Sequence, residues 1–424
     1  MRILIIGNGA REDALSWRLA QSPSCTAIFA SPGNAGTACR GENWEIAATN
    51  GKALAERARR ERIDLAVIGP ETAIAAGVCD QFRQLGISVF GPSRAAGRLE
   101  SSKAFSKRFM ERYGIPTPCA RVVHTLAGAR KELAAWEGGC VVKADGLAAG
   151  KGVVVTPDPA SAVAVLEHWF GSAGIPGGGG DILLEEIARG AEVSVFAIGD
   201  GKMLVPIASA CDYKRAGDGD AGPNTGGMGA YSPALGFPDE LHEIVRKAVL
   251  EPVLRGLREE GESFNGILYC GLMWTTKGPL VLEFNTRFGD PETQVLMPRV
   301  RGDFARLLKS AADGALDLSS ANFDGDPCVG IVLATREYPV ASIPVRALPK
   351  DVTLSAGRVA FWGGSTVRDG VVDVAGGRVL TVTATGATIA YARENAYAGV
   401  AELGRRFDRA GELTYRSDIA AKVP

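Results

Sequence analysis

The chain has 424 residues, with 47 Lys and Arg against 48 Asp and Glu, so its formal net charge is −1. Hydrophobic residues make up 46% and charged residues 22% of the chain, close to the usual shares of about 45–50% and about 25% in globular proteins. This composition excludes disorder as the main state, and the balanced charge argues against a broad nucleic-acid-binding surface. No stretch approaches the roughly 18 apolar residues of a membrane span, so neither a nucleic acid nor a membrane is an expected partner.

Eight cysteines are scattered along the chain without a C-x-x-C pair. That distribution is typical of reduced thiols used as small apolar residues, and it predicts a cytoplasmic protein. The apolar run from Met1 to Gly7 is too short for the core of a secretion signal and predicts a strand instead.

Strand and helix signals alternate through the first hundred residues. We expect strands at 3–6, 27–30, 64–68 and 89–90, and helices at 12–21, 52–61 and 73–85. Each strand ends in a turn that contains Gly or Pro, which predicts a doubly wound parallel sheet. Ligands of such sheets bind at the carboxyl ends of the strands, where all four turns lie, so this unit is predicted to bind a small molecule.

The rest of the chain is predicted to be α/β, and α+β in part. A helix at 102–113 is followed by a Pro-rich linker at 115–118, and a further helix is expected near 161–169. Hairpin strands are expected at 141–143, 152–156, 181–186 and 192–198. In the last hundred residues we expect strands at 329–334, 358–362 and 378–383 and a helix at 389–403.

The first strand leads into Gly7-Asn8-Gly9-Ala10-Arg11-Glu12, which has Glu12 where a dinucleotide fingerprint has its third glycine. A carboxylate there would repel a pyrophosphate at the helix N-terminus, so we expect a substrate loop and no NAD site. The turn Pro32-Gly33-Asn34-Ala35-Gly36-Thr37 offers backbone N–H groups and a hydroxyl, enough to hold one phosphate.

A glycine-rich hairpin is predicted between Lys143 and Gly152. It differs from a Walker A loop, because three residues separate Gly146 from Gly150 and Gly152 stands where that loop has Ser or Thr. With β-type runs on both sides, the hairpin can fold over a triphosphate and bring Lys143 and Lys151 to it.

Three carboxylates follow on the next predicted strands. Glu185 and Glu186 end an apolar strand, and Glu192 lies on the strand after it. Such carboxylates can accept hydrogen bonds from an adenine amino group and from ribose hydroxyls. Taken alone the signal is weak, because a Glu at a strand end is more often simply solvated.

The strongest single motif runs from Leu280 to Gln294. Alternation along a strand places Glu283, Asn285 and Arg287 on one face. Oxygen ligands two positions apart suit Mg²⁺, which prefers one or two protein oxygens with phosphates and water, and the Arg287 fork can clamp phosphoryl oxygens.

A second glycine-rich stretch, from 217 to 229, is predicted to be a loop that closes over substrate. It contains Gly226-Gly227-Met228-Gly229 next to Asn224, Thr225 and Tyr231. The three histidines, at 124, 168 and 242, lie outside all of these motifs, which argues against His-based acid–base chemistry and a His-ligated zinc site.

With these motifs the chain resembles the phosphoribosylamine–glycine ligase (glycinamide ribonucleotide synthetase) family, ATP-grasp enzymes of purine biosynthesis. The resemblance extends essentially from end to end. It rests on Ile6–Gly9, Pro32–Thr37, Gly69-Pro70-Glu71, Ser102–Phe105, Lys143–Gly152, Gly222–Pro233 and Arg287–Gln294.

The resemblance implies ligation of glycine to 5-phosphoribosylamine with ATP and Mg²⁺ or Mn²⁺, by a monomer with an ATP-grasp fold. The implied units are an N-terminal substrate domain, a helix with linker, a lid, a core with the metal site and a C-terminal α/β domain. Their expected ranges are 1–101, 102–120, 121–198, 199–326 and 327–424.

The family's site residues carry over to matching positions of this sequence. The resemblance implies that ATP phosphates contact Lys103, Lys143 and Lys151, with Gly146, Gly150 and Gly152 in the covering hairpin. It further implies Glu185 or Glu186 at adenine, Glu192 at ribose, and Glu283 and Asn285 at the metal. The two remaining substrates are expected at the N-terminal loops and at Asp212, Lys214 and Arg287. The loop positions are Gly7, Asn8, Gly9, Glu12, Pro32, Gly33, Asn34, Gly36, Thr37, Gly69, Glu71, Gly226, Gly227, Met228, Asp290, Pro291 and Glu292.

The sequence departs from the family at two positions, because Asp13 and Tyr213 stand where members usually have His. Two alternatives stay open: an ATP-grasp ligase with another acceptor amine, and a nucleotide-binding regulator without catalysis. The combination of Glu283, Asn285 and the lysines argues against a regulator, which need not keep them together.

Overall fold

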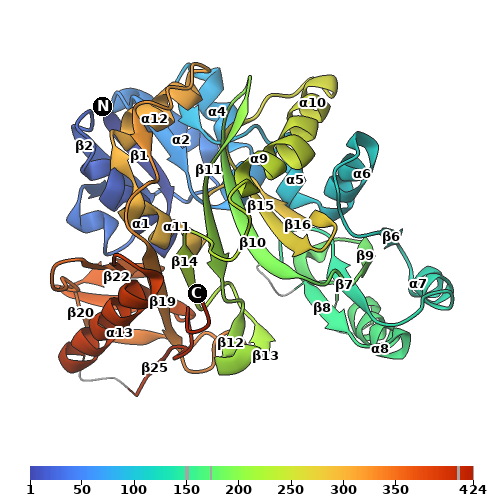
Figure 1. Ribbon diagram of the computed structural model, residues 1–424. Helices are drawn as coiled ribbons and strands as arrows, with labels where there is room; N and C mark the ends of the chain where they lie inside the picture. Colours follow the sequence, from blue (N-terminus) through green and yellow to red (C-terminus); the bar gives the residue numbers. More distant parts are fainter. Residues whose placement is uncertain (149–151, 172–173, 408–410, 424) are drawn as a thin grey trace.

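The computed structural model describes residues 1–148, 152–171, 174–407 and 411–423 (Figure 1). Its N-terminal part is a parallel sheet with the strand order β3-β2-β1-β4-β5. The strands are β1 (Arg2–Gly7), β2 (Ala27–Pro32), β3 (Glu42–Asn43), β4 (Leu65–Ile68) and β5 (Val89–Phe90). The predicted parallel sheet is therefore confirmed, and β3 is an addition that is too short to give a sequence pattern.

Helices cover this sheet: α1 (Ala10–Ala20), α2 (Gly51–Arg60), α3 (Glu71–Ala75) and α4 (Val78–Gln84), with a 3₁₀ turn η1 (Thr37–Cys39). The short α5 (Arg98–Ser101) follows the sheet, and its Leu99 packs in another hydrophobic cluster. The single helix expected over 73–85 is wrong, because α3 and α4 are separate. Gly77 between them has φ +77°, a left-handed conformation that interrupts a helix and that glycine adopts at little cost. The apolar residues Ile74, Val78 and Phe82 keep a helical spacing across the break, which is why the sequence suggested one helix.

A second, antiparallel sheet has the order β6-β9-β7-β8 and lies at one end of the molecule (Figure 1). Its strands are β6 (Ala120–Val123), β7 (Cys140–Ala144), β8 (Val153–Thr156) and β9 (Ile182–Glu186). The helices α7 (Leu126–Leu133) and α8 (Pro159–Phe170) pack on it, followed by a 3₁₀ turn η2 (Pro176–Gly178). The helix α6 (Lys103–Tyr113) precedes it, and the Ser102 hydroxyl caps α6 by accepting from the Phe105 N–H at 3.1 Å.

The strand expected at 192–198 does not join these hairpin strands. It is part of β10 (Ala191–Asp200), which pairs with β11 (Leu204–Asp212) and β15 (Asn265–Thr275) in a large sheet. Residues 193–200 of β10 are all buried, so its apolar sequence predicted a strand correctly. The pairing with β11 is between neighbours in the sequence, but β15 lies far along the chain, and no local pattern records that partner.

The large sheet has the order β16-β15-β10-β11-β14-β19-β24-β21, with β25 beside β19. Its further strands are β14 (Gly229–Ser232), β16 (Gly278–Asn285), β19 (Cys328–Thr335), β21 (Arg358–Trp362), β24 (Arg378–Thr385) and β25 (Leu413–Thr414). Because β14 pairs with β19, the C-terminal hundred residues continue the same sheet as the central part of the chain.

Helices and small sheets complete the chain. The helices are α9 (Leu241–Val245), a π-helical turn η4 (Arg246–Leu250), α10 (Glu251–Glu259), α11 (Glu292–Leu296), a 3₁₀ turn η5 (Met297–Arg299), α12 (Phe304–Ala312) and α13 (Ile389–Arg406). The small sheets are β12 (Arg215–Gly217) with β13 (Ala221–Asn224), β17 (Arg301–Gly302) with β18 (Ala321–Asn322), and β20 (Val345–Pro349), β23 (Val371–Val374) and β22 (Ser365–Arg368). A 3₁₀ turn, η3 (Asp218–Asp220), joins β12 to β13.

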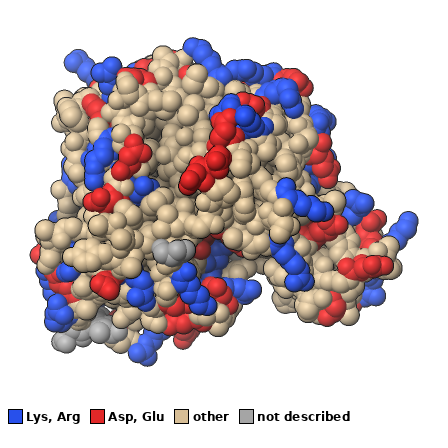
Figure 2. All heavy atoms as spheres, in the orientation of Figure 1, with Lys and Arg blue, Asp and Glu red and all other residues tan. Residues whose placement is uncertain are grey.

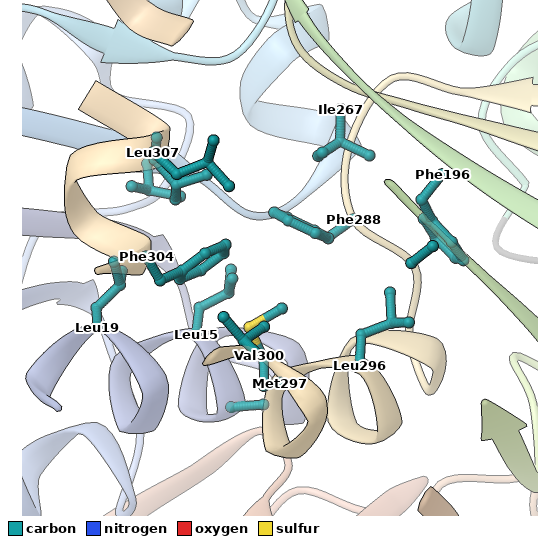
Figure 3. Packing of buried hydrophobic residues seen from close by; sticks show 14 of the residues in the cluster. Leu15, Leu19, Phe196, Ile267, Phe288, Leu296, Met297, Val300, Phe304 and Leu307 are labelled. Carbon is teal, nitrogen blue, oxygen red and sulfur yellow. The ribbon is translucent and has the colours of Figure 1, made fainter. Parts of the chain in front are cut away.

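One hydrophobic cluster joins the N-terminal sheet to the large sheet (Figure 3). Leu15 of α1 lies near Val300 and Met297, and Leu19 lies beside Phe304, while Phe288 lies between Phe304 and Phe196 of the large sheet. Because each large apolar side chain stabilises the fold by roughly 1.5–3 kcal/mol when fully buried, the segment after β16 is firmly held. The predicted metal motif at the end of β16 is therefore held in place by this cluster.

The surface and the cysteines agree with the composition. On the face shown in Figure 2, positive and negative side chains are interspersed. All eight cysteines are free thiols, and Cys79, Cys140, Cys270 and Cys328 are buried. Among the described residues, no helix is both long enough and apolar enough to cross a membrane.

Asp13 joins the first helix to the C-terminal part of the chain. Its fully buried carboxylate pairs with Arg40 and accepts the Trp362 N–H of β21 at 2.7 Å. Burial raises the pKa of Asp13, against the opposing charge of Arg40. This residue, at a position where the resemblance implies His, thus lies at a junction between elements and outside the large cavity described below.

We expect Asp13→Ala to destabilise the fold by about 3–5 kcal/mol, because it leaves Arg40 and the Trp362 N–H without their buried acceptor. Asp13→Asn keeps an acceptor for Trp362 and should cost clearly less. Urea denaturation of the two variants measures the difference. Equal stability of Asp13→Ala and the unsubstituted chain would contradict this role.

Candidate active site

A cavity of about 930 Å³ lies where the four-stranded sheet, α6, the β15–β16 pair and the β12–β13 hairpin meet. It brings together most of the predicted site residues from segments far apart in the sequence. Those lining it are Glu71, Lys103, Lys143, Gly146, Gly152, Glu185, Glu186, Glu192, Asp212, Lys214, Gly226, Glu283, Asn285, Arg287, Asp290 and Glu292. Gly150 and Lys151 lie outside the described residues.

The two described lysines of the predicted nucleotide grip come from different elements that line the cavity. Lys103, the first residue of α6, donates to the Gly146 carbonyl at 2.8 Å, so it is tied to the base of the glycine hairpin. Lys143 on β7 donates to the Leu282 carbonyl of β16 at 3.1 Å. Burial lowers the pKa of Lys103, against the carboxylates of Glu283 and Asp145. The sequence motif therefore places two ammonium groups beside the metal strand.

The neighbouring carboxylates Glu185 and Glu186 have different surroundings. Glu185 is buried and pairs with both Lys143 and Lys107, whereas Glu186 is exposed and lines the same cavity. Lys107 also donates to the Thr117 hydroxyl at 2.6 Å and to the Pro118 carbonyl at 2.8 Å. Sequence reasoning missed Lys107, since a lysine one helical turn after Lys103 has no distinguishing pattern. Glu185 is thus engaged by two lysines, and the adenine contact expected of Glu185 or Glu186 stays a prediction.

The carboxylate of Glu283 interacts electrostatically with several lysines of the cavity. Loss of solvation acts to raise its pKa, but Lys214, Lys143 and Lys103 outweigh that effect and lower the pKa of Glu283. Asn285 is the next residue on the same face of β16, and its Oδ1 accepts from Arg287 Nη2 at 3.0 Å. An ionised carboxylate and an amide oxygen are suitable ligands for Mg²⁺, which takes its other oxygens from phosphates and water. Within the described residues there is no group of three or more Asp, Glu, His and Cys side chains that could hold a metal by itself.

The sequence predicted that the Arg287 guanidinium is available to clamp phosphoryl oxygens. In the structure it is already paired with two carboxylates. Its Nη2 lies 2.8 Å from Glu100 Oε1, and its Nε lies 3.3 Å from Glu71 Oε2. Although burial acts to lower it, Glu100 and Glu71 raise the pKa of Arg287. A phosphoryl clamp would therefore require Arg287 to exchange at least one of these partners.

Glu100 is a functional candidate that the sequence did not reveal. Its Oε2 accepts the backbone N–H of Thr286 at 2.7 Å and the Thr286 hydroxyl at 3.1 Å, while its Oε1 faces Arg287. It thereby fixes the turn after the metal strand. Its only signal in the sequence is its position just before Ser102-Lys103.

Asp212 and Lys214 form an ion pair at the end of β11. Lys214 Nζ lies 3.3 Å from Asp212 Oδ1 and 2.9 Å from Glu192 Oε2. Loss of solvation acts to lower the pKa of Lys214, but Asp212 and Glu192 outweigh it and hold that pKa well above its usual value. Glu192 thus pairs with Lys214 while its own side chain stays half exposed.

A hydrogen-bonded chain leads from β10 to Glu292. The Ser194 hydroxyl donates to the Tyr269 oxygen at 2.9 Å, and the Tyr269 hydroxyl donates to Glu292 Oε1 at 2.8 Å. Burial and the nearby charge of Asp212 raise the pKa of Glu292 to about 7. Neither Ser194 nor Tyr269 belongs to a recognisable motif, because strand pairing alone brings them beside Glu292.

The loop at 226–228 is fixed by residues of the C-terminal part. Arg378 donates to the carbonyls of Gly226 and Asp290 at 2.8 and 2.7 Å, and the Gly226 N–H donates to the Tyr338 hydroxyl at 2.8 Å. Arg378 also lies 3.1 Å from the Asp290 carboxylate. Two more predicted residues pack here: Met228 is buried, and Gly227 has φ +110° and lies so close to Pro291 that a Cβ would be 2.4 Å from its Cδ.

The first N-terminal loop is built around Glu12. Glu12 accepts the Gly9 N–H and the Arg11 Nε–H, both at 2.6 Å, and a Cβ at Gly7 or Gly69 would lie 2.6 or 1.9 Å from it. The carboxylate thus occupies the helix N-terminus itself, which is the position of the pyrophosphate in a dinucleotide site. Arg11 lines the cavity and donates to the Phe288 carbonyl at 3.2 Å, so the loop meets the metal motif through Arg11. Asn8 contributes its carbonyl to the Asn34 side chain at 3.0 Å.

The donors predicted to hold a phosphate at Pro32–Thr37 are already engaged within the protein. The N–H groups of Gly36 and Thr37 donate to Asn34 Oδ1 at 2.9 and 3.0 Å, and the Thr37 hydroxyl is paired with Asn43. Asn34 also donates to the Trp362 carbonyl at 2.9 Å, and Gly33 is packed against Asn43. This turn therefore serves the junction with β21, and a phosphate would have to displace Asn34 to reach these donors.

Tyr213 lines the cavity at a position where the resemblance implies His. Its hydroxyl accepts the Ala420 N–H at 2.9 Å, and the Arg416 guanidinium lies 5.0 Å above its ring. The residue thus connects the C-terminal end of the chain to the Asp212–Lys214 pair.

Three family models match the chain: the N domain of phosphoribosylglycinamide synthetase at residues 1–100, its ATP-grasp (A) domain at 101–293 and its C domain at 328–422. A phosphoribosylamine–glycine ligase of Rhizobium meliloti (strain 1021) is 43% identical over 406 residues, which are 95% of each chain.

Solved structures of other proteins are similar in fold to this chain. The crystal structure of a phosphoribosylamine–glycine ligase from Thermotoga maritima has a TM-score of 0.84 and 32% identity, and it covers 99% of this chain and 100% of that one. A biotin carboxylase domain from Hydrogenobacter thermophilus, solved with MgADP, shares the fold at a TM-score of 0.70 and 15% identity, with 98% and 90% of the two chains covered. The cavity thus lies in an ATP-grasp fold, as the sequence predicted, and the chain belongs to the phosphoribosylglycinamide synthetase family.

Proposed function

We propose that this chain joins glycine to 5-phosphoribosylamine at the expense of ATP, giving glycinamide ribonucleotide, ADP and phosphate. The observation that carries the proposal is the convergence of Lys103, Lys143 and Lys214 on the ionised carboxylate of Glu283 in one cavity. Phosphoryl transfer depends on positioning and charge neutralisation more than on a protein nucleophile, and this cavity supplies both. The relatives named as ligases of this kind support the choice of substrates.

Glu283 and Asn285 would hold a divalent cation, Mg²⁺ or Mn²⁺. Their carboxylate and amide oxygens are suitable ligands, and the lysines keep Glu283 ionised. When bound, the cation supplies positive charge to the ATP phosphates. In the cavity Lys103 and Lys143 would contact the same phosphates, with Lys151 of the covering hairpin.

The proposed reaction has two steps. A glycine carboxylate oxygen attacks the γ-phosphorus of ATP and ADP leaves, which gives glycyl phosphate. The amine of phosphoribosylamine then attacks the acyl carbon, the C–N bond forms, phosphate leaves and the amine loses a proton. Because water would hydrolyse glycyl phosphate, the loops around the cavity must exclude it.

We propose that the remaining residues place the two smaller substrates. Asp212 and Lys214 offer a carboxylate for an ammonium group and an ammonium group for a carboxylate, and Arg287 can receive an anion by exchanging a partner. The N-terminal loops approach through Arg11 and Glu71, and Gly226, Asp290 and Glu292 line the same cavity. A different acceptor amine remains the second candidate. Phosphate release from ATP, Mg²⁺ and glycine, with phosphoribosylamine or with other phosphorylated amines, distinguishes the two.

The cellular setting and the division of the chain are also proposals. We propose a cytoplasmic monomer that acts on small molecules, with domains at 1–101, 121–198, 199–326 and 327–424 and a linker at 102–120. The balanced charge and the free cysteines support the setting. Since β10 begins in the second of these ranges and pairs in the large sheet, a boundary near the start of β10 agrees better with strand pairing.

We expect Glu283→Gln to lower the ligation rate on the order of 10²–10³-fold while the fold remains intact, because the neutral amide cannot balance three ammonium groups or bind a cation strongly. A phosphate-release assay over a range of Mg²⁺ concentrations measures this loss. Glu243→Gln on the exposed face of α9 is the matched control and should leave the rate unchanged. Ligation at the normal rate in Glu283→Gln would refute the site.

The cavity also contains a buried carboxylate that holds its proton unusually tightly. Glu292 has a pKa near 7 in the folded chain, above its ordinary value of about 4.3. The native state therefore binds this proton more strongly than the unfolded state does. Consequently Glu292 makes the free energy of unfolding fall as pH rises from about 4.5 to about 7, with no further change above that range.

We expect Glu292→Gln to remove this fall, because glutamine stays neutral and can still accept from Tyr269. The stability of the variant relative to the unsubstituted chain should rise by up to about 3 kcal/mol between about pH 5 and about pH 8. Urea unfolding at both pH values measures the change. A stability difference independent of pH would show that Glu292 titrates normally.

A further inference from the structure

The C-terminal end of the chain is fastened to a hairpin that forms part of the active-site wall. We define the tail as residues 413–423 and the hairpin as residues 215–224, which comprise β12, η3 and β13. The hairpin and the residues after it contribute Arg215, Asp220, Asn224, Thr225 and Gly226 to the cavity lining.

Arg416 is the centre of this attachment. Its side chain is only 1% exposed, although it lies near the chain terminus. Its Nε and Nη2 donate to the two carboxylate oxygens of Asp418, each at 2.7 Å, which fixes the guanidinium plane. Its Nη1 is then directed at the hairpin, where it donates to Asp220 Oδ1 at 2.8 Å and to the Arg215 carbonyl at 3.1 Å.

Further hydrogen bonds join the tail to the tip of the hairpin. The Ser417 N–H donates to Asp218 Oδ1 and the Gly219 N–H donates to Asp418 Oδ2, both at 2.8 Å. Asp220 has φ +56°, a left-handed conformation that is uncommon for a residue with a Cβ. Such a conformation persists when its surroundings favour it, and here Arg416 holds the Asp220 side chain.

The attachment extends to the ion pair in the cavity. Arg416 lies over the ring of Tyr213, the neighbour of Asp212 and Lys214, and the tail residue Ala420 donates its N–H to the Tyr213 hydroxyl. At the base of the hairpin, both the N–H and the hydroxyl of Thr225 donate to the Lys214 carbonyl, at 2.7 and 2.8 Å. One side chain of the tail thus contacts both the hairpin and the strand end that carries Lys214.

We propose that Arg416 is a positioning residue, which holds the hairpin against the cavity so that the activated glycine reacts with the amine and not with water. This inference rests on the proposed function, in which an acyl phosphate must be shielded. Arg416 itself does not line the cavity, so it acts through Asp220, the Arg215 backbone and Tyr213. Loosening the hairpin would admit water, which takes the acyl group and releases glycine and phosphate without ligation.

The test compares the ADP released with the glycinamide ribonucleotide formed, at saturating ATP, glycine and phosphoribosylamine. For Arg416→Gln we expect ligation to fall by up to about 100-fold, while glycine-dependent ADP release falls much less, so that ADP formed per ligation product rises. Arg358→Gln is the matched control: Arg358 pairs with Glu402 in the same part of the chain and touches neither hairpin nor cavity. The amount of ADP formed per ligation product in Arg358→Gln should equal that of the unsubstituted chain.

A second variant covers the case in which Arg416→Gln does not fold. Asp220→Asn removes only the hairpin side of the ion pair, and because the Asp220 side chain is 69% exposed, its loss should leave the fold intact. In Asp220→Asn, as in Arg416→Gln, the amount of ADP formed per ligation product should rise. An unchanged ratio in both variants, or in Asp220→Asn alone if Arg416→Gln is unfolded, overturns the proposal. If the unsubstituted chain releases no ADP with glycine and phosphoribosylamine, the proposed function fails instead.

Discussion

A carboxylate among three ammonium groups sets the arrangement of the whole cavity. Glu283 would tend to take up a proton where it lies, and Lys103, Lys143 and Lys214 keep it ionised. These lysines come from α6, β7 and the end of β11, so the charge balance requires the four-stranded sheet, the large sheet and the helix before them to meet at one place. Each lysine is in turn held by a backbone carbonyl or another carboxylate, which limits its movement before substrates bind.

Secondary ion pairs fix the backbone around this centre. Glu100 holds Arg287 and both polar groups of Thr286, so the turn after the metal strand has a defined shape. Arg378 holds Gly226 and Asp290 from the opposite side. Since a buried ion pair that loses one partner costs about 3–5 kcal/mol, these pairs are effective constraints on geometry even where they add little net stability. In the proposed reaction that geometry is what positions the amine and excludes water.

The C-terminal part of the chain belongs structurally to the site. It continues the large sheet through β19, and the backbone of its Trp362 is bound by the N-terminal residues Asp13 and Asn34. It also supplies Arg378 and Tyr338 to the 226–228 loop. Asp13 and Tyr213, at positions where the resemblance implies His, both make contacts with this part of the chain. Their consequences should therefore appear first in how the parts of the molecule are held together.

The sequence by itself determined the parallel sheet, the strand–glycine–strand hairpin and the acid–amide pair at the end of β16, because period-two alternation and glycine spacing are local properties. It also determined the family, and with it the expected substrates. Only the tertiary structure decided that Glu100, Lys107, Tyr269 and Arg378 join the site, that Arg287 is already paired, and that Asn34 uses the donors expected to hold a phosphate. These features depend on contacts between residues up to hundreds of positions apart. The energy of such contacts comes from burial and charge pairing after the chain has folded, and no local pattern records it.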